Sequence, residues 1–171
     1  MNPRTVTEEL HDPIAKELLE QAKLTRLAYN GSDGLPRVVP TGFLWNGAEI
    51  VICTATTAPK VRALSHRPDV ALTIDVGDTP ATARALLIRG LASVQIVDGV
   101  PDEYIAGARK VMDEDAVAEF EPAVRGMYDQ MARITITPRW ARLYDFGAGR
   151  LPTFLATLAA KAQPGRSSDA D

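Results

Sequence analysis

Apolar residues recur with helical spacing at the start of the chain and then with a spacing of two. Asp12-Pro13 combines a capping side chain with proline at the first helical position, and Ile14 and Leu18 follow on one face. This spacing predicts an amphipathic helix over about residues 13–22. Short apolar runs separated by turn residues follow, and they predict strands over residues 24–30, 35–45 and 48–56.

The rest of the chain changes period again. Pro59 and Pro68 bound a short helix over residues 59–66. Clean alternation predicts strands over residues 69–76, 85–97 and 133–146, with a bulge or bend at Gly90. Helical spacing over 102–130 predicts two helices, because Pro122 is expected to break the run, and a last amphipathic helix is expected over 151–161.

One hairpin is predicted from its turn. Asn46-Gly47 suits a two-residue turn that needs positive φ, so the strands on either side are expected to pair with each other. Counting outward from this turn places Arg37 roughly level with Thr56. Pro40 lacks a backbone donor, so its strand is expected to be at an edge or interrupted there.

The order of elements predicts the fold class. The predicted order is one helix, a run of antiparallel strands with a short inserted helix, a further helical segment and a returning strand. This order suits a mainly β protein with helices (α+β), built as a small split antiparallel β-barrel. A dinucleotide-binding sheet is excluded, because the first half has no strand-helix-strand rhythm and the chain has no G-x-G-x-x-G segment.

Length and composition predict one globular domain. The chain has 171 residues, 46% hydrophobic and 24% charged. We expect a core over about residues 8–155 and a disordered tail over 162–171. The net charge of −3 argues against a nucleic-acid partner, and the absence of a long apolar run argues against a membrane span. A polar start and a single cysteine favour a cytoplasmic protein.

Nucleophilic and metal chemistry find little support in the sequence. Ser65 and His66 are neighbours on a predicted helix and cannot face each other, and no nucleophile elbow is present. Cys53 lies in an apolar strand and is interpreted as a core residue. Two histidines without ligand spacing, His11 and His66, predict no metal site. The catalytic side chains, if any, stay unassigned.

One segment predicts an anion site. A strand ends in hydroxyl residues that include Thr54 and Thr56, a helix begins near Pro59, and Lys60 falls in its first turn. A cation there opposes the helix dipole unless an anion lies between them, so backbone N–H groups, hydroxyls and Lys60 together suit a phosphate. The alternative is that Lys60 is a solvated lysine and that the threonines only cap the helix.

The same region resembles a known group. The segment Gly34-Leu-Pro-Arg-Val-Val-Pro40 and the following Lys60-Val-Arg-Ala-Leu, with Pro68-Asp-Val-Ala-Leu, resemble the pyridoxamine 5′-phosphate oxidase-like split-barrel superfamily, which holds FMN or the deazaflavin coenzyme F-420. Residues 128–152 resemble the closing strand of its flavin/deazaflavin oxidoreductase branch. The resemblance covers most of residues 8–155.

The resemblance implies a cofactor site and a dimer. It implies that Lys60 binds the cofactor phosphate with help from Arg37. It implies a homodimer with each cofactor between subunits, so Arg89 or Trp140 is expected from the partner chain, although a tryptophan in a closing strand also suits a core or an interface. The expected cofactor-binding residues are Arg37, Val38, Val39, Pro40, Thr41, Thr54, Ala55, Thr56, Lys60, Arg62, Arg89 and Trp140.

Departures from the pattern bear on the substrate. The family's Arg-Lys pair before the helix is Pro59-Lys60 here, and the arginine-rich C-terminal stretch has no counterpart, so pyridoxine 5′-phosphate is a poor substrate prediction. FMN makes the simpler demand, a phosphate pocket alone. Coenzyme F-420 needs a basic groove for its polyglutamate tail, which Arg37, Lys60, Arg62 and Arg67 are able to begin.

These observations together predict an oxidoreductase. Hydride would move between bound FMN, or alternatively coenzyme F-420, and a small conjugated substrate, with Arg89 or Tyr29 as possible proton donors. A second hypothesis is a non-catalytic protein that binds or carries a flavin or deazaflavin, with haem less favoured because neither histidine evidently faces a pocket. A third is a structural dimer that has lost its cofactor.

Overall fold

The fold is described from a computed structural model, which covers residues 2–162. Six helices and seven strands make up this part of the chain. They are α1 (Pro3–Leu10), α2 (Pro13–Gln21), β1 (Thr25–Asn30), β2 (Pro36–Thr41), β3 (Leu44–Trp45), β4 (Ile50–Ala55), α3 (Pro59–His66), β5 (Asp69–Val76), β6 (Arg84–Asp98), α4 (Asp102–Ala108), α5 (Glu114–Met127), β7 (Gln130–Asp145) and α6 (Thr153–Ala162).

All strands join one antiparallel sheet in the order β2-β1-β5-β6-β7-β4-β3. β6 and β7 are its longest members and pair along their lengths, from Arg84 opposite Asp145 to Asp98 opposite Gln130. Consecutive strands β2 and β3 stand at the two ends of this order, so the curled sheet stays open between them. The predicted α+β split barrel is confirmed.

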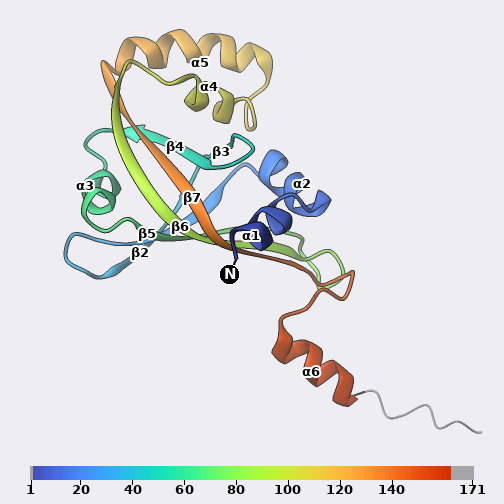
Figure 1. Cartoon of the computed structure of the whole chain (residues 1–171). Helices are drawn as coiled ribbons and strands as arrows, with labels where there is room; N and C mark the ends of the chain where they lie inside the picture. The colour runs from blue at the N-terminus through green and yellow to red at the C-terminus, as the bar shows by residue number, and fades with distance from the viewer. Residues whose placement is uncertain (1, 163–171) are drawn as a thin grey trace, which may run out of the picture.

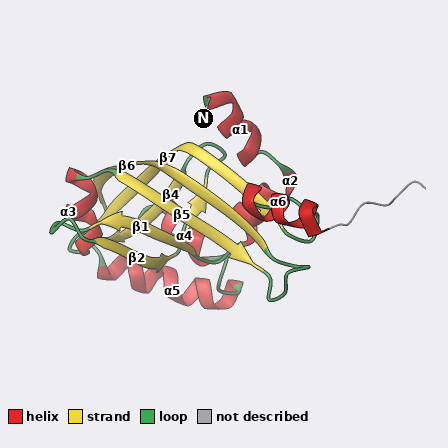
Figure 2. Cartoon of the chain, turned by 90° about the horizontal axis from the view of Figure 1, so that it is seen from below, coloured by secondary structure: helices red, strands yellow, loops and turns green. Residues whose placement is uncertain are grey.

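The helices surround the sheet on several sides. Figure 1 shows α4 and α5 over one end of the barrel, α3 at one flank, and α1 with α2 at the other. Figure 2, seen from below, shows the strands crossing between these groups, and Figure 1 shows α6 extending away from the body. No helix within residues 2–162 combines the length and the apolar character that crossing a membrane requires.

The buried side chains form two clusters. The larger one fills the barrel and takes alternate residues of β1, β4, β5, β6 and β7, as period-two patterning requires. Its largest fully buried members include Leu27, Ile52, Leu72, Ile88 and Ile134. The smaller one lies between α4, α5 and the sheet, and consists of Val100, Ile105, Val117, Val124 and Met131.

The strand prediction at Gly90 is confirmed in detail. The register between β6 and β7 shifts between Arg89 and Gly90, so that Arg89 faces Trp140 while Gly90 faces Pro138. A Cβ atom at position 90 would lie 2.5 Å from the carbonyl oxygen of Thr137, closer than real contacts allow. Glycine is therefore needed where the two long strands bend together.

Two helix predictions need correction. Residues 3–10 form α1, which was not predicted, because its two buried apolar residues, Val6 and Leu10, are too few to reveal a period. Pro122 does not end a helix but lies inside α5, and the break between the two helices falls at residues 109–113 instead. Residues 163–171 of the expected disordered tail lie outside the described residues, and Ala162 ends α6.

Candidate functional site

The first turn of α3 has no side-chain cap among the described residues. Ala58 is the N-cap residue in an extended conformation, and Pro59 takes the first helical position. Thr54 and Thr56 are half-buried beside this turn, and neither hydroxyl has a hydrogen-bond partner in residues 2–162. The alternative interpretation, in which these threonines cap the helix, is therefore wrong. In this turn, Ala58 N–H donates to the carbonyl oxygen of Ala55 and Val61 N–H to that of Ala58, and Pro59 has no N–H. The N–H of Lys60 therefore remains available to an anion.

Lys60 lies half-buried in this turn. Burial lowers the pKa of its ammonium group. Across the described part of the chain, its side chain has no ion pair and no hydrogen bond. A half-buried cation without a partner, at the positive end of a helix dipole, is destabilising unless an anion binds against it. Lys60, the uncapped turn and the two hydroxyls thus fit the phosphate of a bound cofactor.

Arg37 reaches the neighbourhood of this turn by a route other than the one predicted. The expected pairing of its strand with β4 is wrong: β2 pairs with β1, and Arg37 faces Tyr29. The Asn46-Gly47 turn joins only β3 to β4, because the chain leaves the sheet at Gly42 and Phe43. Arg37 nevertheless shares a hollow of about 260 Å³ with Pro59 of α3.

The guanidinium of Arg37 is already engaged. Its Nη2 atom lies 2.7 Å from Oδ2 of Asp33, and its Nη1 atom donates to the carbonyl oxygens of Leu35 and Pro36. Hydrogen bonds from Leu35 and from Arg37 keep the pKa of Asp33 below its ordinary value. The arginine therefore braces the turn between β1 and β2, and its role toward a phosphate stays a prediction.

The edge position predicted for the Pro40 strand is confirmed, because β2 is the first strand in the sheet order. Its residues divide between two faces. Val38 is 65% exposed on the outer face, and Val39 packs against the core. Pro40 and Thr41 line a cavity at the open side of the barrel.

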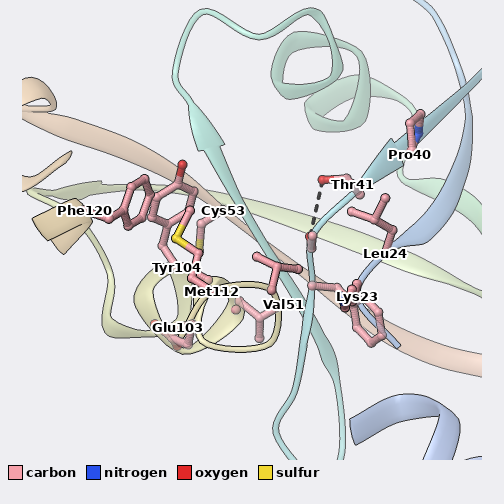
Figure 3. A pocket seen from close by; sticks show the side chains of 15 residues that line it. Lys23, Leu24, Pro40, Thr41, Val51, Cys53, Glu103, Tyr104, Met112 and Phe120 are labelled. Atoms are coloured by element: carbon pink, nitrogen blue, oxygen red, sulfur yellow. Dashed lines mark hydrogen bonds between the residues drawn. The ribbon is translucent and has the colours of Figure 1, made fainter. Parts of the chain in front are cut away.

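That cavity has a volume of about 490 Å³, within the range of about 300–1,000 Å³ that is usual for small-molecule sites. β2 and the link after it form one wall and β4 the opposite wall, while α4, the loop after it and Phe120 of α5 form the third. Figure 3 shows Tyr104, Phe120 and Met112 gathered near Cys53, across β4 from Thr41 and Pro40. The lining residues are Lys23, Leu24, Pro40, Thr41, Gly42, Phe43, Val51, Cys53, Glu103, Tyr104, Gly107, Ala108, Val111, Met112 and Phe120.

A second hollow, of about 380 Å³, lies on the outer face of the sheet. Arg37, Val38 and Arg89 all line it, so the structure brings together three of the predicted site residues here. Trp140 lies opposite Arg89, whose Cζ atom is 4.5 Å from the centroid of the Trp140 ring. Such a cation–π contact holds the guanidinium of Arg89 against the ring of Trp140.

Arg62 points elsewhere. It lines a hollow of about 230 Å³ with Ser32, His66 and Arg67, on the side of α3 that faces the turn between β1 and β2. Arg67 donates to the carbonyl oxygen of Gly31 at 2.7 Å and so ties α3 to this turn. The predicted basic residues near α3 are thus divided between separate hollows, and Lys60 lines neither the outer hollow nor this one.

The aromatic and sulfur lining of the large cavity was not predicted from the sequence. Tyr104, Met112 and Phe120 lie in the segment 102–130, which was predicted as helical, and Cys53 was interpreted as a core residue. Cys53 is half-buried at the cavity wall, and burial raises the pKa of its thiol to about 11. No group of three or more His, Cys, Asp or Glu side chains in residues 2–162 is arranged to hold a metal ion.

Comparison with known families identifies this architecture. The family model for pyridoxamine 5′-phosphate oxidase matches residues 12–144, which is most of the chain and includes β1 to β7. The chain belongs to the pyridoxamine 5′-phosphate oxidase family. Membership confirms the resemblance seen in the sequence and agrees with the open, antiparallel barrel. No curated protein matches the chain.

Solved structures with the same fold differ in what their names describe. An F420 reductase is 27% identical, with 74% of this chain and 94% of that chain covered and a TM-score of 0.58. A conserved hypothetical protein from Mycobacterium tuberculosis is 20% identical over 98% of this chain and 94% of that chain, with a TM-score of 0.61. HutZ, the heme storage protein from Vibrio cholerae, is 18% identical over 78% and 93%, with a TM-score of 0.56.

Proposed function

We propose that this protein is a flavin- or deazaflavin-dependent oxidoreductase that transfers hydride between bound FMN or coenzyme F-420 and a small conjugated substrate. Lys60 carries the proposal. It is a half-buried lysine without a partner in the described chain, set in an uncapped helix turn of a family that includes an oxidase and an F420 reductase. An anionic cofactor supplies the charge that this turn lacks.

The residues of the chain then bind and orient the cofactor. Lys60, the first turn of α3 and the hydroxyls of Thr54 and Thr56 would hold the phosphate, with Ala55 between them on β4. The free edge of β2, from Val38 to Thr41, would present backbone groups to the flat ring. The cofactor supplies the hydride chemistry when bound, and the protein supplies position and electrostatics.

FMN is the first choice of cofactor and coenzyme F-420 the alternative. FMN requires only the phosphate site at α3. The reductase that is 27% identical favours F-420, and the hollow lined by Arg62 and Arg67 offers positive charge close to the same helix. Titration with each cofactor separates the two.

The functional unit is proposed to be a homodimer with the cofactor between subunits. The outer hollow supports this arrangement, because Arg89 and Trp140 lie on an open sheet face together with the exposed Val38. A partner subunit on that face would bring Arg89 or Trp140 to the cofactor of the other protomer.

A non-catalytic carrier of the same cofactor is the second candidate function. The cavity lining supports a carrier because its thiol and its phenol stay neutral at physiological pH. Burial raises the pKa of both groups, Cys53 and Tyr104. Haem is the less favoured cargo. The Nδ1 atom of His11 lies 2.8 Å from Thr7 O, and that of His66 lies 3.0 Å from Arg62 O, and neither histidine lines the large cavity.

Turnover separates an enzyme from a carrier. The protein is loaded with FMN or coenzyme F-420, the cofactor is reduced, and an electron-poor quinone is added without oxygen while absorbance is followed. We expect bound cofactor to be reoxidised faster than free cofactor at equal concentration. Reoxidation that is slower in the complex than in free solution would support the carrier and contradict the oxidoreductase.

A further inference from the structure

We infer that the cavity at the open side of the barrel, roofed by α4 and α5, selects a neutral, planar ring compound as the substrate of the proposed oxidoreductase. The inference rests on the proposed function for the role of this ligand as substrate. The ligand class itself follows from the side chains that line the cavity, and it is tested by binding alone.

The walls of the cavity are aromatic and polarisable. The rings of Tyr104 and Phe120 stack with centroids 6.0 Å apart and 29° between their planes. Cys53 and Met112 bring two sulfur atoms to the same side, as Figure 3 shows. Flat rings stack on aromatic faces, and thioether and thiol groups contact ring edges favourably, so this wall suits a planar conjugated compound better than a branched or flexible one.

The charges at the cavity disfavour an anionic ligand. Glu103 is the acidic residue of the lining, and its Oε1 atom accepts from both Nε and Nη2 of Arg133, at 2.9 and 2.8 Å. This pairing uses the nearby arginine and leaves a carboxylate at the wall. Lys23 is the one basic residue of the lining and is exposed to solvent. A sulfonate or phosphate inside the cavity would therefore lose its water without gaining a buried cation.

One lysine fastens the roof of the cavity to the barrel. Lys110, just after α4, donates from Nζ to the carbonyl oxygen of Leu19 at 3.0 Å and to that of Phe43 at 3.4 Å. Its ammonium also lies 3.9 Å from the centroid of the Phe43 ring. These contacts fasten α4 to α2 and to the link between β2 and β3, so α4 is held over the cavity.

Gly107 is the position where a substitution can fill the cavity. It lines the cavity from α4, and the nearest atom to a Cβ built there is the carbonyl oxygen of Phe43, at an ordinary contact distance of 3.9 Å. A larger side chain at position 107 thus enters the cavity without clashing at its base. Gly126 is a matched control, because it lies in α5 and a Cβ there meets nothing within 4 Å.

The experiment compares two probes and three variants by isothermal titration calorimetry. The probes are 2,3-dimethyl-1,4-naphthoquinone, which is neutral, and 3-methyl-1,4-naphthoquinone-2-sulfonate, which differs by one charged group. We expect the neutral probe to bind at least tenfold more tightly. Gly107→Leu should weaken its binding tenfold or more, Gly107→Ala by less, and Gly126→Leu not at all. Circular dichroism confirms that each variant is folded.

Cofactor affinity is measured in the same variants. Unchanged cofactor binding in Gly107→Leu, with loss of the neutral probe, supports a separate substrate chamber. Equal binding of the two probes, or a Gly107→Leu variant that binds the neutral probe normally, would overturn the inference, and so would a cofactor affinity that falls by the same factor. If no cofactor binds while the neutral probe behaves as expected, the proposed function fails and the ligand class of the cavity stands.

Discussion

Two residues have the largest expected effects: Lys60 on cofactor binding and Gly90 on the stability of the fold. The sequence predicted Lys60 correctly as a cation in the first turn of a helix, because the helix start was marked by Pro59. The sequence could not show that Lys60 is half-buried and without a partner in the described chain, because burial depends on how α3 packs on the sheet. Arg37 was placed on the correct strand, but its ion pair with Asp33 was missed.

Gly90→Ala should destabilise the fold. The added Cβ would lie 2.5 Å from the Thr137 carbonyl oxygen, so β6 and β7 must move apart at their bulge. We expect the free energy of unfolding to fall by about 1–3 kcal/mol, as for other overpacked sites, in urea denaturation. Gly126→Ala, which meets open space in a helix, should instead be neutral or raise stability by up to about 1 kcal/mol. Equal effects of the two substitutions would contradict this account of Gly90.

At the scale of elements, local patterns predicted the types of most strands and helices. Alternation marked β5, β6 and β7, Asp12-Pro13 marked α2, and Pro59 with Pro68 marked α3. The partner of β2 was predicted wrongly, because a good two-residue turn at Asn46-Gly47 says nothing about how far the pairing continues. In the structure, Gly42 and Phe43 take the chain off one edge of the sheet and onto the other, and this step creates the cavity.

The fastening of α4 should depend on pH. Burial lowers the pKa of Lys110 to about 8, against an ordinary value of 10.5, while the charge of Glu20 acts in the opposite direction. The unfolded chain therefore holds the lysine proton more tightly than the folded protein between these pH values. The contribution of Lys110 to the free energy of unfolding therefore rises as the pH increases from about 8 to 10.5.

Lys110→Met isolates the effect. We expect the stability of the wild type relative to Lys110→Met to increase as pH rises from about 8 toward 10.5, measured by urea unfolding at several pH values. A stability difference that stays constant over this range would show that Lys110 has no lowered pKa.

At the scale of the whole molecule, the open barrel carries two hollows that no local sequence pattern predicts. The family and the fold could be predicted from about half of the chain, where the strand, turn and helix signals near Arg37 and Lys60 occur in order. The large cavity could not, because its lining comes from β2, β4, α4 and α5, which are distant in sequence. The same holds for the outer hollow, where Val38 meets Arg89 only through the order of the sheet.

A mixed dimer tests whether two subunits share each cofactor site. Lys60→Ala and Arg89→Ala are coexpressed with different tags, and the heterodimer is purified. If Lys60 comes from one subunit and Arg89 from the other, one site of the heterodimer keeps both residues, and we expect one cofactor per dimer at wild-type affinity. A monomer in analytical ultracentrifugation, or a heterodimer with no intact site, would refute the shared site.

Titration of the cofactor-free protein with FMN and, separately, with coenzyme F-420 is the most direct test of the central claim, with fluorescence as the readout. Lys60→Ala is measured beside Lys16→Ala, which removes an exposed lysine of α2. We expect one cofactor to bind tightly, Lys60→Ala to weaken it tenfold or more, about 1.4 kcal/mol for a charge-assisted phosphate contact, and Lys16→Ala to bind normally. Failure of both cofactors to bind, or an unchanged affinity in Lys60→Ala, would contradict the phosphate site at α3.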